Sequence, residues 1–146
     1  MGSGFLRIAF ATPEYVTEKY FDGGLANHTH RVAKALAGMG HDIHVLTLSD
    51  IDDAEFVHDG VTVHRIKSRR WWSRLEFSIN VHRALKRIDS QQALDLVQFP
   101  NYSSCGVVSM CCLRVPYVLR ASSYQPALND ALGVRRTLKV RMACRP

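Results

Sequence analysis

Hydrophobic residues recur along this chain in two kinds of pattern. Short continuous apolar runs are typical of buried strands, and apolar residues three or four positions apart are typical of helices with one buried face. The first pattern predicts strands over residues 5–12, 42–48, 61–66, 94–99 and 116–121. The second pattern predicts helices over residues 25–39, 77–88 and 107–113, and a basic helix over residues 128–145.

Strands and helices alternate along the chain. Such alternation predicts an α/β fold, a Rossmann-like three-layer α/β/α domain with a mainly parallel sheet. A chain of 146 residues is long enough to bury a true hydrophobic core within one domain of this kind. We therefore expect residues 1–146 to form a single domain.

The first predicted helix carries a histidine whose role the pattern leaves open. The inward face of this helix is expected to carry the apolar residues Leu25, Val32, Leu36 and Met39. His28 falls one turn before Val32 on the same face. It is either a packed or backbone-bonded histidine or a ligand for an acceptor or phosphate group.

Two adjacent glycines, Gly23 and Gly24, come immediately before this helix. Glycine has no Cβ, so a ligand can approach the backbone closely, and the first N–H groups of a helix have no partner within it. An anion or a sugar can be bound at such a helix start. The alternative is a flexible turn that only begins the helix.

Polar side chains accompany the carboxyl ends of the last two predicted strands. Asn101 and Tyr102 follow the fourth strand, while Arg120 lies near the end of the fifth and Ser122 follows it. The carboxyl ends of parallel strands meet at one edge of the sheet, where α/β proteins place their ligand sites. We therefore expect these residues to share a pocket with the glycine pair and with His28.

The formal net charge of +6 favours anionic partners such as nucleic acid, anionic lipid or phosphorylated metabolites. A basic and aromatic cluster at residues 69–72 suits either contact with an anionic membrane surface or an ordinary solvated surface. No nucleic-acid partner is predicted, because no known binding motif accompanies this cluster.

The chain shows no sequence feature of membrane insertion or export. No apolar run approaches the ~20 residues that span a bilayer, and residues 1–12 lack the features of a signal peptide. A cytoplasmic protein is expected, and peripheral contact with the inner face of the membrane remains open.

Four cysteines lie in the second half of the chain, at Cys105, Cys111, Cys112 and Cys144. They are expected to be buried free thiols, as is usual inside the cell. The spacing of cysteine, histidine and carboxylate residues matches no zinc motif, so the sequence predicts no metal site.

The segment from Phe5 to about Leu48 resembles the start of the family-4 retaining glycosyltransferases. The resemblance rests on the glycine pair, on the helix that ends with Ala35-Leu36 and Gly40-His41, and on the apolar strand that follows. Residues 94–100 and 116–120 are similar to the fourth and fifth strands of that family.

This resemblance implies one half of a GT-B enzyme, in which two Rossmann-like domains face each other across a cleft. In that family the N-terminal half mostly holds the acceptor, and the C-terminal half binds the nucleotide sugar. The glycine-pair loop also reaches the donor diphosphate, a role that would fall to Gly23 and Gly24. The family often has a histidine near the sugar where this chain has Ser122.

The implied function is transfer of a sugar from a nucleotide-diphosphate sugar to a glycan, a cell-envelope component or a lipid-linked acceptor, with retention of configuration. Catalysis would rest on positioning and charge stabilisation, and the catalytic residues remain unassigned. The nucleotide sugar is a co-substrate, and no other cofactor is expected.

The implied enzyme needs a second half. The donor-binding half of the family has no counterpart in this sequence, so we expect no sugar transfer by the chain alone. A C-terminal donor domain or a partner chain would have to supply it. The alternative is a non-catalytic binding or partner subunit of a split glycosyltransferase.

Overall fold

The computed structural model of the chain describes residues 4–16, 23–49, 51–67, 73–101 and 104–121. Its strands are β1 (Arg7–Thr12), β2 (Asp42–Ser49), β3 (Ala54–His58), β4 (Val61–Lys67), β5 (Leu96–Pro100) and β6 (Tyr117–Arg120). Its helices are α1 (Gly24–Gly38), α2 (Ser73–Gln91) and α3 (Val107–Cys112). The strands form one sheet in the order β3-β4-β2-β1-β5-β6.

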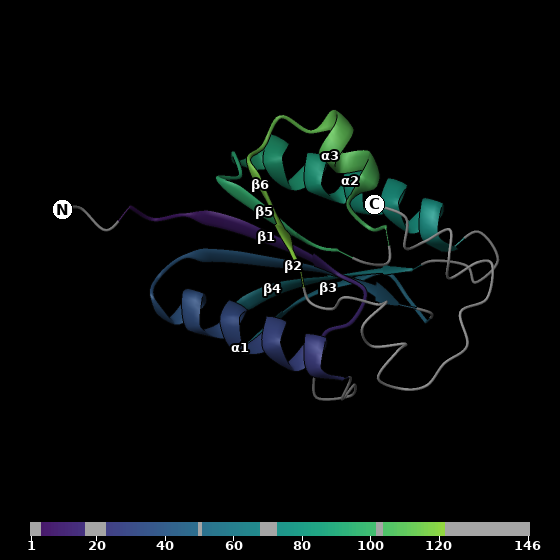
Figure 1. Ribbon diagram of the computed structural model, residues 1–146. Coiled ribbons are helices and arrows are strands. Elements are labelled where there is room, and N and C mark those ends of the chain that lie inside the picture. The colour runs from purple at the N-terminus through teal and green to yellow at the C-terminus, as the bar shows by residue number, and fades with distance from the viewer. Residues whose placement is uncertain (1–3, 17–22, 50, 68–72, 102–103, 122–146) are drawn as a thin grey trace.

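The sheet is covered on both faces. Helix α1 lies on one face, and α2 and α3 lie on the other (Figure 1). All neighbouring strands pair in parallel except β3, which runs antiparallel to β4. The predicted Rossmann-like α/β fold with a mainly parallel sheet is therefore confirmed.

Each central strand contributes to two hydrophobic cores, because successive side chains point to opposite faces. The core under α1 consists of Ile8, Phe10, Tyr15, Ala33, Ile43, Val45, Val61 and Val63. The core under α2 and α3 is built around Phe77, Val81, Leu85 and Ile88 of α2, which pack on Leu46, Val97 and Phe99 of the sheet. The continuous apolar runs of β1 and β2 are thus explained by burial on both sides.

The edge strand β3 was not predicted. Its five residues, Ala54–His58, alternate between half-buried and exposed positions, and Phe56 is their only large inward-facing apolar side chain. The turn Asp59-Gly60 joins β3 to β4 with positive φ angles of 52° and 78°. Such a pair is typical of a tight β-hairpin turn, so this dipeptide was the signal for the missed strand.

The predicted inward face of helix α1 is confirmed in part, because Val32 and Leu36 pack, partly buried, against the core beneath the helix. Its buried residues are Ala26, Thr29 and Ala33, and Met39, at its C-terminal end, is 72% exposed. His28 is exposed as well, so the prediction that it lies on the inward face is wrong. Small side chains line the contact because they let the helix lie close to the strands.

Polar side chains are buried where the sheet meets α2. Arg7 Nε lies 2.7 Å from Asp42 Oδ2 and 3.2 Å from His44 Nε2. His44 Nδ1 lies 3.0 Å from His64 Nε2. The other ring nitrogen of His64, Nδ1, lies 3.0 Å from Glu55 Oε2. This polar chain, which is buried at Arg7, His44 and His64, crosses four neighbouring strands, from β1 to β3.

Three of the cysteines fall within the described residues, and all three are free thiols. Cys105 is buried as predicted, whereas Cys111 and Cys112 are exposed, because the short α3 buries only one of its sides. Three other predictions lie outside the described residues. They concern Cys144, the basic helix over residues 128–145 and the cluster at residues 69–72.

Candidate functional site

The carboxyl ends of the parallel strands lie along one edge of the sheet, at the right in Figure 1. The chain leaves β1 toward α1 and β2 on one side, while β5 pairs with β1 on the other side. In open α/β sheets, ligands bind where the strand order reverses in this way. The edge beside β1 and β5 is therefore the candidate functional site.

Gly23 and Gly24 stand at this edge, where α1 begins. Gly23 has φ −65° and ψ −164°, an extended conformation open to any residue. A Cβ at Gly23 would meet only Glu14 Oε2, at 3.9 Å, and a Cβ at Gly24 would meet no atom within 4 Å. Within the described residues, the fold therefore needs glycine at neither position, and the space above them is open.

Among the described residues, no side chain is found to cap the first turn of α1. Gly23 occupies the N-cap position, and the turn contains no acidic residue. The Asn27 side chain donates to the carbonyl of Gly23 at 3.2 Å. The N–H groups of the first turn and the positive end of the helix dipole together favour an anion at this position.

Glu14 is a further residue at this edge, and sequence analysis gave it no role. The loop after β1 is fixed by the Thr12 hydroxyl, which donates to the carbonyl oxygen of Glu14 at 2.9 Å. The Glu14 carboxylate is the nearest group to the open side of Gly23. It offers an acceptor for a hydroxyl group beside the start of α1.

The last two strands also bring predicted site residues to this edge. Asn101 is exposed directly after β5, and its N–H donates to the carbonyl of Arg120 at the end of β6, at 3.0 Å. Arg120 Nη1 is buried and has no hydrogen-bond partner among the described residues. Tyr102 and Ser122 lie outside the described part of the chain. The structure thus places Asn101 and Arg120 on the same edge as the glycine pair.

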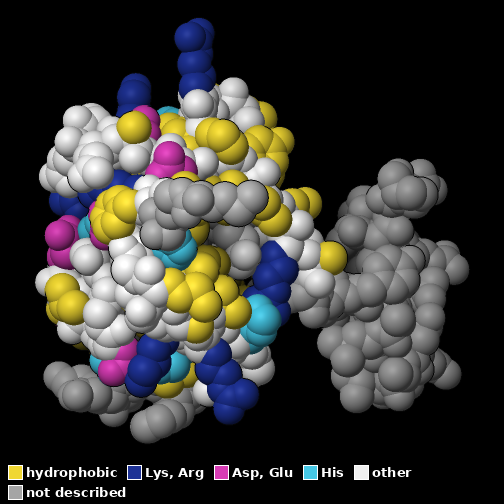
Figure 2. All heavy atoms as spheres, turned by 90° about the vertical axis from the view of Figure 1, so that its left-hand side faces the viewer, with side chains coloured by type: hydrophobic (Ala, Val, Ile, Leu, Met, Phe, Trp, Pro, Cys, Tyr) yellow, Lys and Arg dark blue, Asp and Glu magenta, His cyan; other side chains and the backbone are white. Residues whose placement is uncertain are grey.

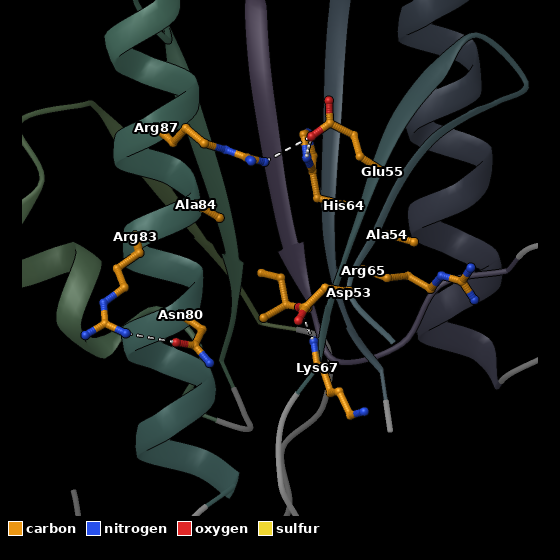
Figure 3. Close-up of a pocket in the computed structure, with 11 residues that line it drawn as sticks. Asp53, Ala54, Glu55, His64, Arg65, Lys67, Asn80, Arg83, Ala84 and Arg87 are labelled. Atoms are coloured by element: carbon orange, nitrogen blue, oxygen red, sulfur yellow. Dashed lines mark hydrogen bonds and ion pairs between the residues drawn. The ribbon is translucent and has the colours of Figure 1, made fainter. Parts of the chain in front are cut away.

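A pocket of about 520 Å³ lies elsewhere, between α2 and the β3–β4 hairpin (Figure 3). Arg83 and Arg87 line it from α2, and Lys67 lines it from β4. Arg87 pairs with Glu55 across the pocket at 3.0 Å, and Arg83 donates to Asn80 at 3.4 Å. Sequence analysis gave these arginines no role, and β3, which forms the opposite wall of the pocket, was not predicted. None of the predicted site residues lines this pocket.

The pocket is more basic than acidic. Its cationic side chains are Arg65, Lys67, Arg83 and Arg87, and its carboxylates are Asp53 and Glu55. Figure 3 shows the Arg65 guanidinium pointing away from α2 and the Arg83 guanidinium turned toward Asn80 of its own helix, while Arg87 reaches Glu55. The Asp53 carboxylate accepts a hydrogen bond from the backbone N–H of Lys67 at 2.8 Å. The pocket therefore offers the Lys67 side chain to an acidic group.

The amino ends of the strands lie on the opposite face of the molecule. Figure 2 shows hydrophobic side chains there, interspersed with basic, acidic and histidine side chains. Two of the most exposed large apolar residues are Met39, at 72%, and Phe5, at 61%. Among the described helices, none is long and apolar enough to cross a membrane.

Comparisons with known proteins agree with this fold. Residues 22–129 match the sequence model of the family described as Glycosyltransferase Family 4. The solved structure of sucrose-phosphate synthase from Thermosynechococcus elongatus matches with a TM-score of 0.65 and 13% sequence identity. The match covers 86% of this chain but 35% of the synthase chain, so this chain spans about a third of that protein's length. No curated protein matches the sequence.

Proposed function

The chain belongs to glycosyltransferase family 4, and from this premise we propose that it is the N-terminal, acceptor-side domain of a retaining glycosyltransferase. The proposed donor is a nucleotide-diphosphate sugar, and the proposed acceptor is a glycan or a lipid-linked component of the cell envelope. The donor-binding half would come from a C-terminal domain or a partner chain. The proposed location is the cytoplasm. If the acceptor is lipid-linked, the proposed location is the inner face of the membrane.

One observation carries this proposal. The first turn of α1 presents N–H groups at the candidate edge that no described side chain is found to cap, behind two glycines that the described fold does not need. A donor diphosphate carries negative charge on oxygen atoms, which suits both the helix dipole and close contact with the backbone. Side chains at these positions would keep the phosphate oxygens away from the N–H groups.

The neighbouring groups support a role in holding the acceptor. The Glu14 carboxylate beside Gly23 offers a hydrogen-bond acceptor for a sugar hydroxyl. Arg120 Nη1, which has no hydrogen-bond partner among the described residues, offers a donor on the same edge. Transfer would then depend on positioning the acceptor hydroxyl against the donor and on stabilising the leaving diphosphate.

Calorimetry on the 146-residue chain tests the assignment of halves. We expect weak binding of uridine- and guanosine-diphosphate sugars, with Kd above about 100 μM, because most donor contacts would lie on the other half. We also expect no sugar transfer by the chain alone. Sub-micromolar binding, or turnover by the isolated chain, would overturn the acceptor-side assignment.

A nuclear magnetic resonance titration tests the loop itself. Adding a nucleoside diphosphate should shift the backbone amide signals of Gly23, Gly24 and Leu25 before other signals. The Asn27 side-chain amide, which binds the carbonyl of Gly23, serves as a local reference. Shifts confined to other parts of the chain would show that the glycine pair has no part in phosphate binding.

A further inference from the structure

Three potential metal ligands meet away from the proposed sugar site. His30 lies in the middle of α1, His58 ends β3, and Asp59 begins the turn that follows. One ligand atom from each of them lies within 4.8 Å of the others. Because they come from two separate segments, only the folded chain brings them together.

The distances approach those of a metal site. His30 Nε2 lies 3.3 Å from Asp59 Oδ2. Two ligand atoms bound tetrahedrally to zinc at 2.0–2.2 Å are about 3.4 Å apart, so this pair already has the required separation. The rings of His30 and His58 have centroids 5.4 Å apart. No hydrogen bond from the His58 ring is found among the described residues, so this ring is free to turn toward an ion.

A buried tyrosine orients the His30 ring. The Tyr15 hydroxyl lies 3.3 Å from His30 Nδ1, which leaves Nε2 directed at Asp59. In a metal complex, Nδ1–H would donate to the Tyr15 oxygen, and the Nε2 lone pair would face the ion. Metal-binding histidines are commonly held by such a partner on their second nitrogen.

The backbone holds the two segments in place. Asp59 has a φ of 52° and Gly60 a φ of 78°, so the tight turn directs the start of β4 back along the sheet. A Cβ on Gly60 would lie 3.7 Å from the Cβ of Ala37, which shows how closely the turn packs on α1. The ligands are therefore presented by two packed elements and not by a long loop.

Lys34 competes for the same carboxylate. Its Nζ lies 2.8 Å from Asp59 Oδ2, one turn along α1 from His30. An ion would have to share Asp59 with this ammonium group or displace it. The positive charge also opposes a cation at short range, so Lys34 sets an upper limit on the affinity.

We propose that His30, His58 and Asp59 form a binding site for a divalent transition metal of the zinc type. Two imidazole nitrogens and one carboxylate oxygen are a ligand set that suits zinc, with water completing the coordination. The bound ion would join the β3–β4 turn to α1, the helix whose first turn carries the glycine pair. The sequence predicted no metal site, because spacing along the chain does not show this contact.

Zinc titration of the untagged chain tests the site. We expect one zinc ion per chain by calorimetry, and a rise in the thermal unfolding temperature when zinc is added. His30→Ala, His58→Ala and Asp59→Asn should each weaken binding more than about tenfold, and Tyr15→Phe by about tenfold. His28→Ala is the matched control, because this exposed histidine lies on the same helix outside the cluster, and it should leave zinc affinity unchanged.

Two results separate this site from other zinc-binding groups. Lys34→Gln should strengthen zinc binding, because it removes the competing ammonium group. Cobalt(II) should give the visible absorption bands of oxygen and nitrogen coordination, without a thiolate charge-transfer band. A thiolate band would place the ion on the free cysteines and overturn the proposal. Three other results would overturn it as well. They are no zinc binding below about millimolar concentration, a loss of zinc affinity in His28→Ala equal to that in the ligand variants, and weaker zinc binding in Lys34→Gln.

Discussion

Lowering the pH from about 7.5 to 5.5 should lower the free energy of unfolding, because two histidines are buried in the sheet. His44 and His64 are 7% and 5% exposed, and their rings are stacked with centroids 5.3 Å apart. One pair of neutral tautomers is consistent with the contacts of both rings. Arg7 donates to His44 Nε2, His44 Nδ1–H donates to His64 Nε2, and the His64 Nδ1 proton faces Glu55.

The sign of the effect follows from the two pKa values. Burial lowers the pKa of His44, against the nearby Asp42 carboxylate, which raises it. Burial also lowers the pKa of His64, against the charge of Glu55. The cations facing the pair, Arg7 of β1 and Arg87 of α2, lower these pKa values further. As the pH falls below about 6.5, the unfolded chain therefore binds protons before the folded chain does.

The size of the effect follows from the number of protons. Each proton bound only by the unfolded chain costs about 1.4 kcal/mol per pH unit. Between pH 7.5 and 5.5, one histidine that stays neutral in the fold therefore lowers stability by about 1.4 kcal/mol, and two by about 2.7 kcal/mol. The stability contributed by the neutral pair is fully present above pH ~6.5 and is lost as the pH falls through the lowered folded pKa values.

Urea unfolding, followed by circular dichroism at both pH values, measures this change. In His64→Gln an amide replaces one ring, so the difference in stability between the two pH values should fall by about 1.4 kcal/mol. His28→Gln, which replaces an exposed histidine, is the control and should keep the wild-type difference. Equal wild-type stability at both pH values, or an unchanged difference in His64→Gln, would refute the reasoning.

Three further substitutions test packing and the glycine pair. Gly106→Ala should destabilise the fold by about 1–3 kcal/mol in urea unfolding, because its Cβ would lie 2.5 Å from Phe99 Cδ1. Unchanged stability there would mean that α3 does not pack on Phe99 as described. Leu85→Ala, at a fully buried position of α2, should cost about 2–5 kcal/mol by the same measurement. A loss below about 1 kcal/mol would place α2 away from the core. Gly24→Val should keep or slightly raise stability, because glycine is a poor helix former and no atom lies within 4 Å of its Cβ position. It should still abolish diphosphate-induced shifts of the Leu25 amide signal, and unfolding of this variant would show that the glycine serves the fold.

The positions of the central strands were readable from local sequence. The strands β1, β2 and β4 carry mostly apolar or β-branched residues, and such runs are stable only where both faces are covered. Their alternation with helical spacing then limits the fold to a parallel α/β sheet. The strand boundaries moved by one or two residues, because hydrogen bonding between strands decides where each one ends.

Two features of the fold could not be predicted from local sequence in this way, namely the edge strand β3 and the buried residues of α1. The edge strand β3 has one large apolar side chain facing inward, so its pattern is too weak to separate it from a polar turn. In α1, alanine and threonine are the fully buried residues, Val32 and Leu36 are partly buried beside them, and Met39 is exposed. Apolar spacing therefore did not show which residues lie nearest the sheet, because close approach to the sheet favours small residues.

The same distinction applies to the candidate site: its local features could be predicted from sequence, and its contacts between separate elements could not. The glycine pair was found from sequence because its signal is local: two residues without Cβ atoms directly before a helix. The sequence by itself also determined that Asn101 follows one strand, that Arg120 lies at the end of another, and that both strands end at the same edge. The basic pocket beside α2, the buried histidine chain and the cluster of His30, His58 and Asp59 were decided only by tertiary structure. Each of them depends on distances between side chains of separate elements, and packing sets those distances, whereas spacing along the chain does not.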